Sequence, residues 1–143
     1  MMTILSSIPA VAKQALRWAA VAGTTLILGE ATVLAENAVS SLMKQRLADV
    51  AGKVVTVLTV DYAPGAASEP HVHPGSVVAY VLEGAVVSQM EGGEPITYTR
   101  GQTWYESPRR PHVVSKNASK TEPAKVLAFL LSEEGEPIKA PMP

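Results

Sequence analysis

The sequence predicts an all-β fold in a single domain, closed as a sandwich or barrel. After Lys53 the chain consists of about seven short runs rich in β-branched residues, each separated from the next by glycine, proline or polar residues. Many short strands with frequent turns are typical of sandwiches and barrels, in which closure leaves few unpaired sheet edges. The chain has 143 residues, which is enough for one hydrophobic core.

The expected strands follow from β-branched and alternating residues between turn signals. In chain order they are 53–62, 77–82, 85–90, 96–100, 102–106, 112–116 and 125–131. Residues 77–82 are apolar at every alternate position on both faces, which predicts a strand covered on both sides. The Glu83-Gly84 pair predicts a tight hairpin to residues 85–90. Only residues 40–50 have a helical pattern, and the segment after Glu133 is polar and rich in proline.

The first 35 residues differ from the rest and predict a secretory signal peptide. Lys13 and Arg17 precede an uncharged stretch of 12 residues, 18–29, and small residues lead to a cleavage site after Ala35. Twelve residues are too few to cross a bilayer core, which needs about 20. The alternatives are a buried or amphipathic N-terminal helix, or an uncleaved anchor. We therefore expect a domain over 36–143 and a periplasmic or secreted location, with membrane contact only through the export signal.

Composition excludes several functions. The net charge is −1, and no basic run is longer than Arg109-Arg110, so we expect no nucleic-acid partner. The chain has no cysteine, which removes disulfides, thiol nucleophiles and thiolate ligands. Any metal must therefore be held by nitrogen and oxygen donors.

All three histidines lie in two short segments, His71-Val72-His73 and His112. Side chains at i and i+2 of a strand leave the same face, roughly 6.5 Å apart along the strand. Two imidazoles so placed can converge on one metal ion, and a third from another strand can complete the set. Pro70 and Pro74 bracket the pair, which places it at a strand end or barrel rim. The predicted metal ligands are thus His71, His73 and His112.

These residues resemble the motifs of the cupin superfamily, small jelly-roll β-barrels with a metal at the mouth. The first cupin motif contains a glycine, then five residues, an H-x-H pair, a glutamate and a closing glycine. Gly65, His71, His73 and Gly84 match it. The second motif runs from a glycine through a proline turn to a histidine eleven residues on. Gly101, Pro108 and His112 match it, although the proline and Asn117 each fall one place late and Arg110 replaces the usual glycine region.

The resemblance covers residues 48–132 and implies a single-domain cupin-type jelly-roll β-barrel. It departs from the family at one ligand, because the place of the motif's glutamate is taken by Val77. Three neutral imidazoles leave the charge of a divalent ion uncompensated. This disfavours Mn²⁺ and suits one Zn, Fe, Cu or Ni ion. An anionic small-molecule ligand, such as a carboxylate or enolate, would supply the missing charge.

Four other side chains are candidates to replace the glutamate: Glu69, Gln89, Tyr98 and Glu106. Glu106 is a candidate acceptor for a histidine N–H. The favoured interpretation of each carboxylate is a solvated surface group, which leaves no general base beside the histidines. Trp104 and Tyr105 are alternately placed, so one is expected inside the barrel and the other outside, and core packing is the favoured role of both. The Arg109-Arg110 pair is expected in a solvated turn, with attraction of an anion to the mouth as the alternative.

Three functions remain open. The first is a metal-dependent small-molecule enzyme of oxygenase, isomerase or lyase type, using the ion as Lewis acid or redox centre. The second is a non-catalytic periplasmic barrel that binds a metal or small ligand. The third is a barrel without metal that works through dimer contacts, since a homodimer through sheet edges is expected of single cupin domains.

Overall fold

The computed structural model describes residues 37–142, all of whose regular elements are strands. The predicted signal peptide, 1–35, lies outside the described residues. The all-β prediction is confirmed. The strands are β1 (Ala38–Arg46), β2 (Lys53–Tyr62), β3 (Ala67–Ser68), β4 (His71–Val72), β5 (Ser76–Glu83), β6 (Ala85–Met90), β7 (Ile96–Thr99), β8 (Thr103–Glu106), β9 (His112–Asn117), β10 (Ala124–Glu133) and β11 (Ala140–Pro141).

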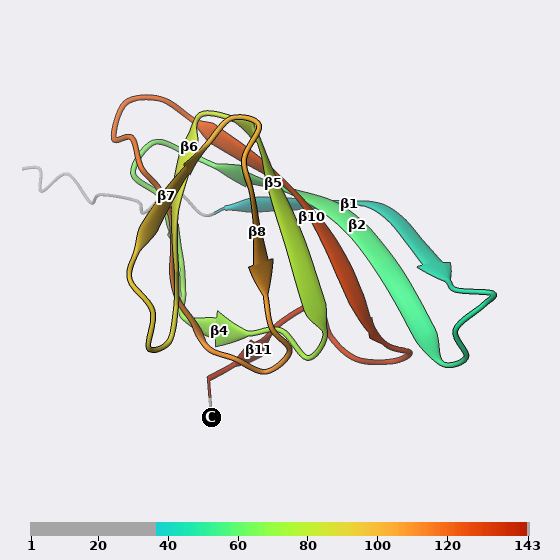
Figure 1. Ribbon diagram of the computed structural model, residues 1–143. Helices are drawn as coiled ribbons and strands as arrows, with labels where there is room; N and C mark the ends of the chain where they lie inside the picture. The colour runs from blue at the N-terminus through green and yellow to red at the C-terminus, as the bar shows by residue number, and fades with distance from the viewer. Residues whose placement is uncertain (1–36, 143) are drawn as a thin grey trace, which may run out of the picture. The chain divides into compact units, whose positions relative to one another are not determined.

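The strands form two antiparallel sheets that face each other as a jelly roll (Figure 1). One sheet has the order β1-β2-β10-β5-β8, and the other has the order β11-β4-β9-β6-β7, with β3 also paired to β9. The long β2–β10 pair runs from Lys53↔Glu133 to Tyr62↔Ala124 without interruption. Residues far apart in the sequence therefore lie side by side, which is how the barrel brings a site together.

The helical expectation for residues 40–50 was wrong. Residues 38–46 form β1, which pairs with β2 from Ala38↔Asp61 to Arg46↔Val54, with one irregularity between Ser41 and Met43. Every residue of β1 is exposed, so the apolar spacing there reflects no buried helical face. Pairing with β2 satisfies the backbone groups on the inner edge of β1 and outweighs local helical preference.

The expected hairpin at Glu83-Gly84 was also wrong. β5 pairs with β10 and β8, whereas β6 pairs with β7 and β9, so the link carries the chain from one sheet to the other. Gly84 has φ +67, and a Cβ there would lie 2.5 Å from the Pro123 carbonyl oxygen. Glycine is needed because both this backbone conformation and the close approach exclude a side chain.

The strand over residues 77–82 is covered on one side only, contrary to expectation. Val77, Ala79 and Val81 are buried, while Val78 and Tyr80 on the other face are 46% and 37% exposed. An all-apolar run does not distinguish a strand buried on both faces from one that leaves its apolar outer face in solvent.

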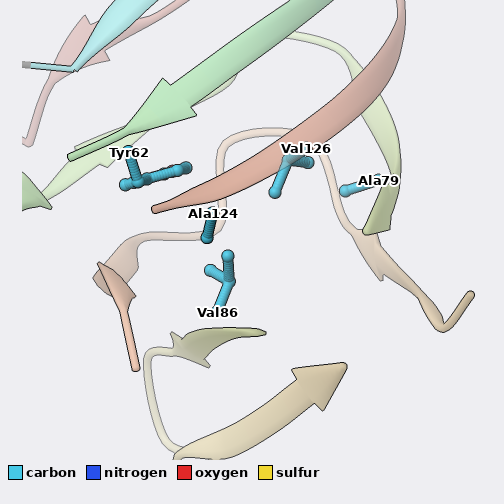
Figure 2. Close-up of a cluster of buried hydrophobic side chains, with 5 residues drawn as sticks. All are labelled: Tyr62, Ala79, Val86, Ala124 and Val126. Carbon is cyan, nitrogen blue, oxygen red and sulfur yellow. The ribbon is translucent and has the colours of Figure 1, made fainter. Parts of the chain in front are cut away.

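The core lies between the sheets. Tyr62 of β2, Ala79 of β5, and Ala124 and Val126 of β10 form one buried cluster with Val86, which comes from β6 in the opposite sheet. Figure 2 shows the Val86 side chain pointing across toward Ala124. This packing fills the barrel between β2, β5, β6 and β10. The histidines lie elsewhere, on β4, just after β4, and on β9.

The segment after Glu133 does more than the polar tail that the sequence predicts. Its residues Ala140 and Pro141 form β11, which pairs with Val72 and His71 of β4, and Figure 1 shows the two strands together near the C-terminus. No helix in residues 37–142 is long and apolar enough to cross a membrane.

Candidate metal centre

The three histidines meet in the structure, as their spacing predicts. His71 of β4 and His112 of β9 are directly paired across the sheet, and His73 follows β4 at the start of the turn to β5. One ring nitrogen from each lies within 4.8 Å of the others. The Nε2 atoms of His71 and His73 are 3.1 Å apart, so residues i and i+2 do point into the same space.

Hydrogen bonds fix the protonation of two rings. His71 Nδ1 lies 2.7 Å from the Glu69 carbonyl oxygen, and His73 Nδ1 lies 2.6 Å from the Ile138 carbonyl oxygen. A carbonyl only accepts, so both Nδ1 atoms carry the proton, and Nε2 of each neutral ring is a lone-pair acceptor. Two acceptors 3.1 Å apart repel each other unless a proton on one of the rings or a metal ion lies between them. This donor set fits a metal ion.

His112 is hydrogen-bonded through Nε2, whereas His71 and His73 are hydrogen-bonded through Nδ1. Its Nε2 lies 2.8 Å from the Ser88 hydroxyl, a contact in which both residues are buried. When Nε2 donates to Ser88, Nδ1 is free to bind a cation. Nδ1 is buried, has no hydrogen-bond partner and lies 3.2 Å from Oε2 of Glu106. An unpaired buried nitrogen beside two other lone pairs again fits a metal.

Glu106 is the residue that the sequence interpretation misjudged. The favoured surface carboxylate is in fact 3% exposed, at the end of β8, and it lies beside the histidines. Its Oε1 accepts from the Trp104 indole N–H at 2.8 Å, while Oε2 lies 3.4 Å from His73 Nε2. The expected absence of an acid or base beside the histidines is therefore wrong.

Electrostatics favour an anionic Glu106 and a neutral His71. Burial raises the pKa of the Glu106 carboxyl, but His112, His73 and the Trp104 N–H together lower that pKa below its ordinary value. Burial lowers the pKa of His71, against the opposing effect of the Glu69 carbonyl, and His73 and His112 lower it further. A neutral imidazole and a carboxylate are the forms that bind metals.

The other candidates lie away from the histidines. Glu69 is exposed and contributes only its carbonyl oxygen. Gln89 donates to the Gly93 carbonyl, and Tyr98 stacks on Trp104 with ring centroids 4.8 Å apart.

Trp104 lies inside the barrel and Tyr105 outside, as their alternation predicts. Trp104 packs against the core, but Tyr105 is 56% exposed and its hydroxyl pairs with that of Ser76, so the expectation of core packing is wrong for Tyr105. Neighbouring strand residues face opposite sides, so Trp104 and Glu106 turn inward while Tyr105 turns outward. Arg109 and Arg110 are exposed, as predicted for a solvated turn.

A cavity of about 280 Å³ opens beside the three histidines and Glu106. Most of its wall is aliphatic and comes from both sheets and the tail: Val39, Leu58, Val60, Val77, Ala79, Val126, Ala128, Leu130 and Ile138. Polar groups gather around the histidines and at the Tyr62–Ser115 hydroxyl pair, 2.7 Å apart. An apolar cavity with a few convergent polar groups is the usual form of a small-molecule site.

Sequence reasoning missed two residues that support the histidines. Ser88 lies on β6 with no motif around it, and Ile138 lies in the tail and acts through its carbonyl, which any residue carries. Residues 133–143 contain two large apolar side chains, Ile138 and Met142. An isolated isoleucine in a polar segment is only a weak indication that the segment packs against the barrel.

The fold agrees with comparisons to known proteins. The family model described as Cupin domain matches residues 58–130. None of the curated proteins matches the chain. Among solved structures, a double-stranded beta-helix domain protein of Klebsiella pneumoniae is similar over 73% of this chain and 83% of its own, with 19% identity and a TM-score of 0.57.

Two further solved structures show the same likeness. A cupin domain of Bordetella pertussis is similar over 67% of this chain and 93% of its own, with 17% identity and a TM-score of 0.53. The DMSP lyase DddQ of Ruegeria pomeroyi is similar over 61% of this chain, with 20% identity and a TM-score of 0.53, but this chain covers only 42% of the lyase. At these identities the likeness shows the fold alone.

Proposed function

This chain belongs to the cupin superfamily, and on that premise we propose that it binds one divalent transition metal through His71, His73 and His112. We propose further that it is a small-molecule enzyme in which this ion acts as Lewis acid or redox centre. Zn, Fe, Cu and Ni ions all suit imidazole donors.

The observation that carries the proposal is the facing pair of Nε2 atoms. Both Nδ1 atoms are committed to carbonyl oxygens, so neither ring can turn its proton toward the other without losing a hydrogen bond. The third ring adds a buried unpaired Nδ1. Leaving such groups unsatisfied costs about 1–3 kcal/mol each, and a shared cation satisfies all of them.

The cavity supports a small ligand with an apolar body and an oxygen or anionic end. Its aliphatic wall would take the body, and its volume of about 280 Å³ is near the lower limit for ligand pockets. The polar end would meet the histidines. Lys139 is the only lysine or arginine among the described residues that line the cavity, and its ammonium would attract an anion.

The residues of the chain have separate tasks in this function. The three imidazoles hold the ion, which supplies Lewis-acid or redox chemistry when bound. The aliphatic wall orients the ligand and excludes water. Among the described residues, Glu106 is the one carboxylate that lines the cavity, and it is able to accept a proton, provided that it is not itself bound to the ion.

A non-catalytic metal- or ligand-binding barrel is the second candidate, and one observation favours it. The polar groups of the wall are largely paired within the protein: Tyr62 with Ser115, Trp104 with Glu106, and the outer nitrogen of each histidine with a carbonyl or Ser88. Few of these groups are free to move a proton during a reaction.

The proposed location is the periplasm or outside the cell, and it rests on the signal-like residues 1–35. A homodimer through sheet edges is part of the same proposal. It is supported by the exposed edge strand β1, whose Val39, Leu42 and Met43 are all solvent-exposed.

Metal uptake by the untagged full chain tests the proposal. After equilibrium dialysis against Zn²⁺, Fe²⁺, Co²⁺, Ni²⁺ and Cu²⁺, wild type and a Glu69→Gln control should carry one ion per chain, and His71→Ala should carry none. Equal metal content in His71→Ala and wild type would refute the site. Addition of carboxylic acids from acetate to hexanoate to the Co²⁺ protein should change its visible spectrum, more weakly in Lys139→Ala. If metal binds and no acid changes the spectrum, the proposed ligand class is wrong.

Enzyme and binding barrel are separated by the fate of a bound acid. Incubation with metal-loaded protein, followed by mass spectrometry, should show conversion that His71→Ala lacks. Recovery of every bound acid unchanged favours the non-catalytic barrel.

A further inference from the structure

We infer that Glu106 is the fourth ligand of this metal centre and replaces, from the neighbouring strand, the carboxylate that the cupin motif carries at the position of Val77. The inference rests on the proposed metal binding and deepens it. It assigns a ligand that the motif pattern places elsewhere.

The register of the sheet makes the two positions equivalent. Val77 of β5 and Glu106 of β8 are direct partners in the antiparallel pair. Directly opposed residues point to the same face with their Cβ atoms about 4.5–5.5 Å apart. Both side chains are buried and both line the cavity that holds the histidines. A glutamate at either position therefore reaches the same space, and a valine fills the other position.

The distances fit a shared ion. Two donors each about 2.1 Å from one metal lie about 3.0 Å apart at a right angle and about 3.4 Å apart in a tetrahedral arrangement. Oε2 of Glu106 is 3.2 Å from His112 Nδ1 and 3.4 Å from His73 Nε2. The Nε2 atoms of His71 and His73 are 3.1 Å apart. These three separations are those of neighbouring ligands. The histidine donors as a set span up to 4.8 Å, more than the about 4.2 Å between two ligands on opposite sides of one ion, so the rings close inward when the ion binds.

Glu106 is also prepared for this role by its surroundings. Oε1 is held by the Trp104 indole N–H at 2.8 Å, which fixes the plane of the carboxylate. Oε2 is buried and has no hydrogen-bond partner. In Figure 1, β8 runs toward the end of the barrel where β4 and β11 lie. Glu106 is the last residue of β8, and its Oε2 lies 3.4 Å from His73 Nε2.

A carboxylate ligand changes the chemistry expected from three histidines alone. The charge of the centre falls from +2 to +1, so the ligand need not neutralise the ion by itself. An oxygen donor also admits harder ions, so Mn²⁺ joins the candidates. Glu106 would then hold the metal rather than act as a free base.

The test compares Co²⁺ affinity and the Co²⁺ visible spectrum in wild type, Glu106→Gln, Val77→Glu/Glu106→Val and the control Glu69→Gln. The amide of Glu106→Gln keeps an oxygen for the Trp104 N–H but loses the anionic donor. We expect the Co²⁺ affinity of Glu106→Gln to fall about 100-fold and its visible spectrum to shift. If Glu106 only orients the histidines, its loss would lower the affinity about 10–100-fold but would leave the ligand set, and so the spectrum, unchanged. The double variant should recover affinity to within about tenfold of wild type, and Glu69→Gln should match wild type.

Melting curves of the metal-free variants confirm that each is folded. A wild-type spectrum in Glu106→Gln overturns the ligand assignment, even if affinity falls, because Glu106 would then only orient His112 and His73. A folded double variant that binds no better than Glu106→Gln overturns the equivalence of the two positions. If wild type itself binds no Co²⁺, the proposed function fails and this inference fails with it.

Discussion

Deletion of the C-terminal residues 138–143 should weaken metal binding without unfolding the barrel. The deletion removes the Ile138 carbonyl that accepts from His73 Nδ1 at 2.6 Å, and it removes β11, which pairs with His71 and Val72. Ile138 is 42% exposed, so little core packing is lost. The His73 ring would then be free to rotate and to change its protonated nitrogen.

The size of the effect follows from the lost contacts. One hydrogen bond contributes about 0.5–1.5 kcal/mol, and outer partners of metal ligands contribute about 10–100-fold in affinity. A free-energy change of 1.4 kcal/mol is a factor of about ten in affinity, so the upper end of the hydrogen-bond range equals the lower end of the outer-partner range. We therefore expect the Zn²⁺ affinity to fall about tenfold. Loss of Lys139 acts in the opposite direction, since removal of a nearby positive charge favours a cation.

Competition with a coloured chelator measures the affinity for Zn²⁺. Ile138→Ala is the matched control, because it keeps the backbone carbonyl and should bind within about twofold of wild type. An affinity of the deletion variant equal to that of wild type, in a protein that still melts cooperatively, would refute the assignment of Ile138 as the group that orients His73.

Three other predictions concern single substitutions. Ser88→Ala should lower Zn²⁺ affinity about tenfold by releasing His112 Nε2, and an unchanged titration would contradict this. Burial raises the pKa of the Tyr62 hydroxyl above its ordinary value of 10.0, so its contribution to folding is present below pH 10 and is lost as pH rises through the folded-state pKa. Urea unfolding should therefore show a steeper alkaline loss of stability in wild type than in Tyr62→Phe, and parallel losses would argue against this. Gly75→Ala should destabilise the protein by roughly 3 kcal/mol or more, because its Cβ would lie 2.0 Å from the Leu131 carbonyl oxygen; a melting temperature like that of wild type would contradict the close contact.

Much of the fold could be predicted because its signals are local. Residues 53–62 and 85–90 were predicted with the bounds that the structure gives to β2 and β6, since β-branched runs and turn residues define them directly. The i, i+2 spacing of His71 and His73 likewise predicted that their rings would meet. In each case a single stretch of chain contains the information.

The errors concern features that depend on which strands become neighbours. The link at Gly84 was taken for a hairpin because both flanking strands are adjacent in sequence, yet they belong to different sheets. Glu106 was taken for a surface residue because its partner Val77 lies on a strand separated from it by β6 and β7. The sequence does not predict the role of residues 138–141, because it depends on their backbone groups. These pair with β4 and accept a hydrogen bond from His73 Nδ1, and any residue type supplies such groups.

The central claim is that one metal ion is held among His71, His73 and His112. The most direct measurement is an anomalous-difference map from crystals of the protein grown with Zn²⁺. We predict one strong peak per chain, about 2.0–2.2 Å from Nε2 of His71, Nε2 of His73 and Nδ1 of His112. A map with no peak among these three nitrogens, or with zinc only at exposed carboxylates, would contradict the claim.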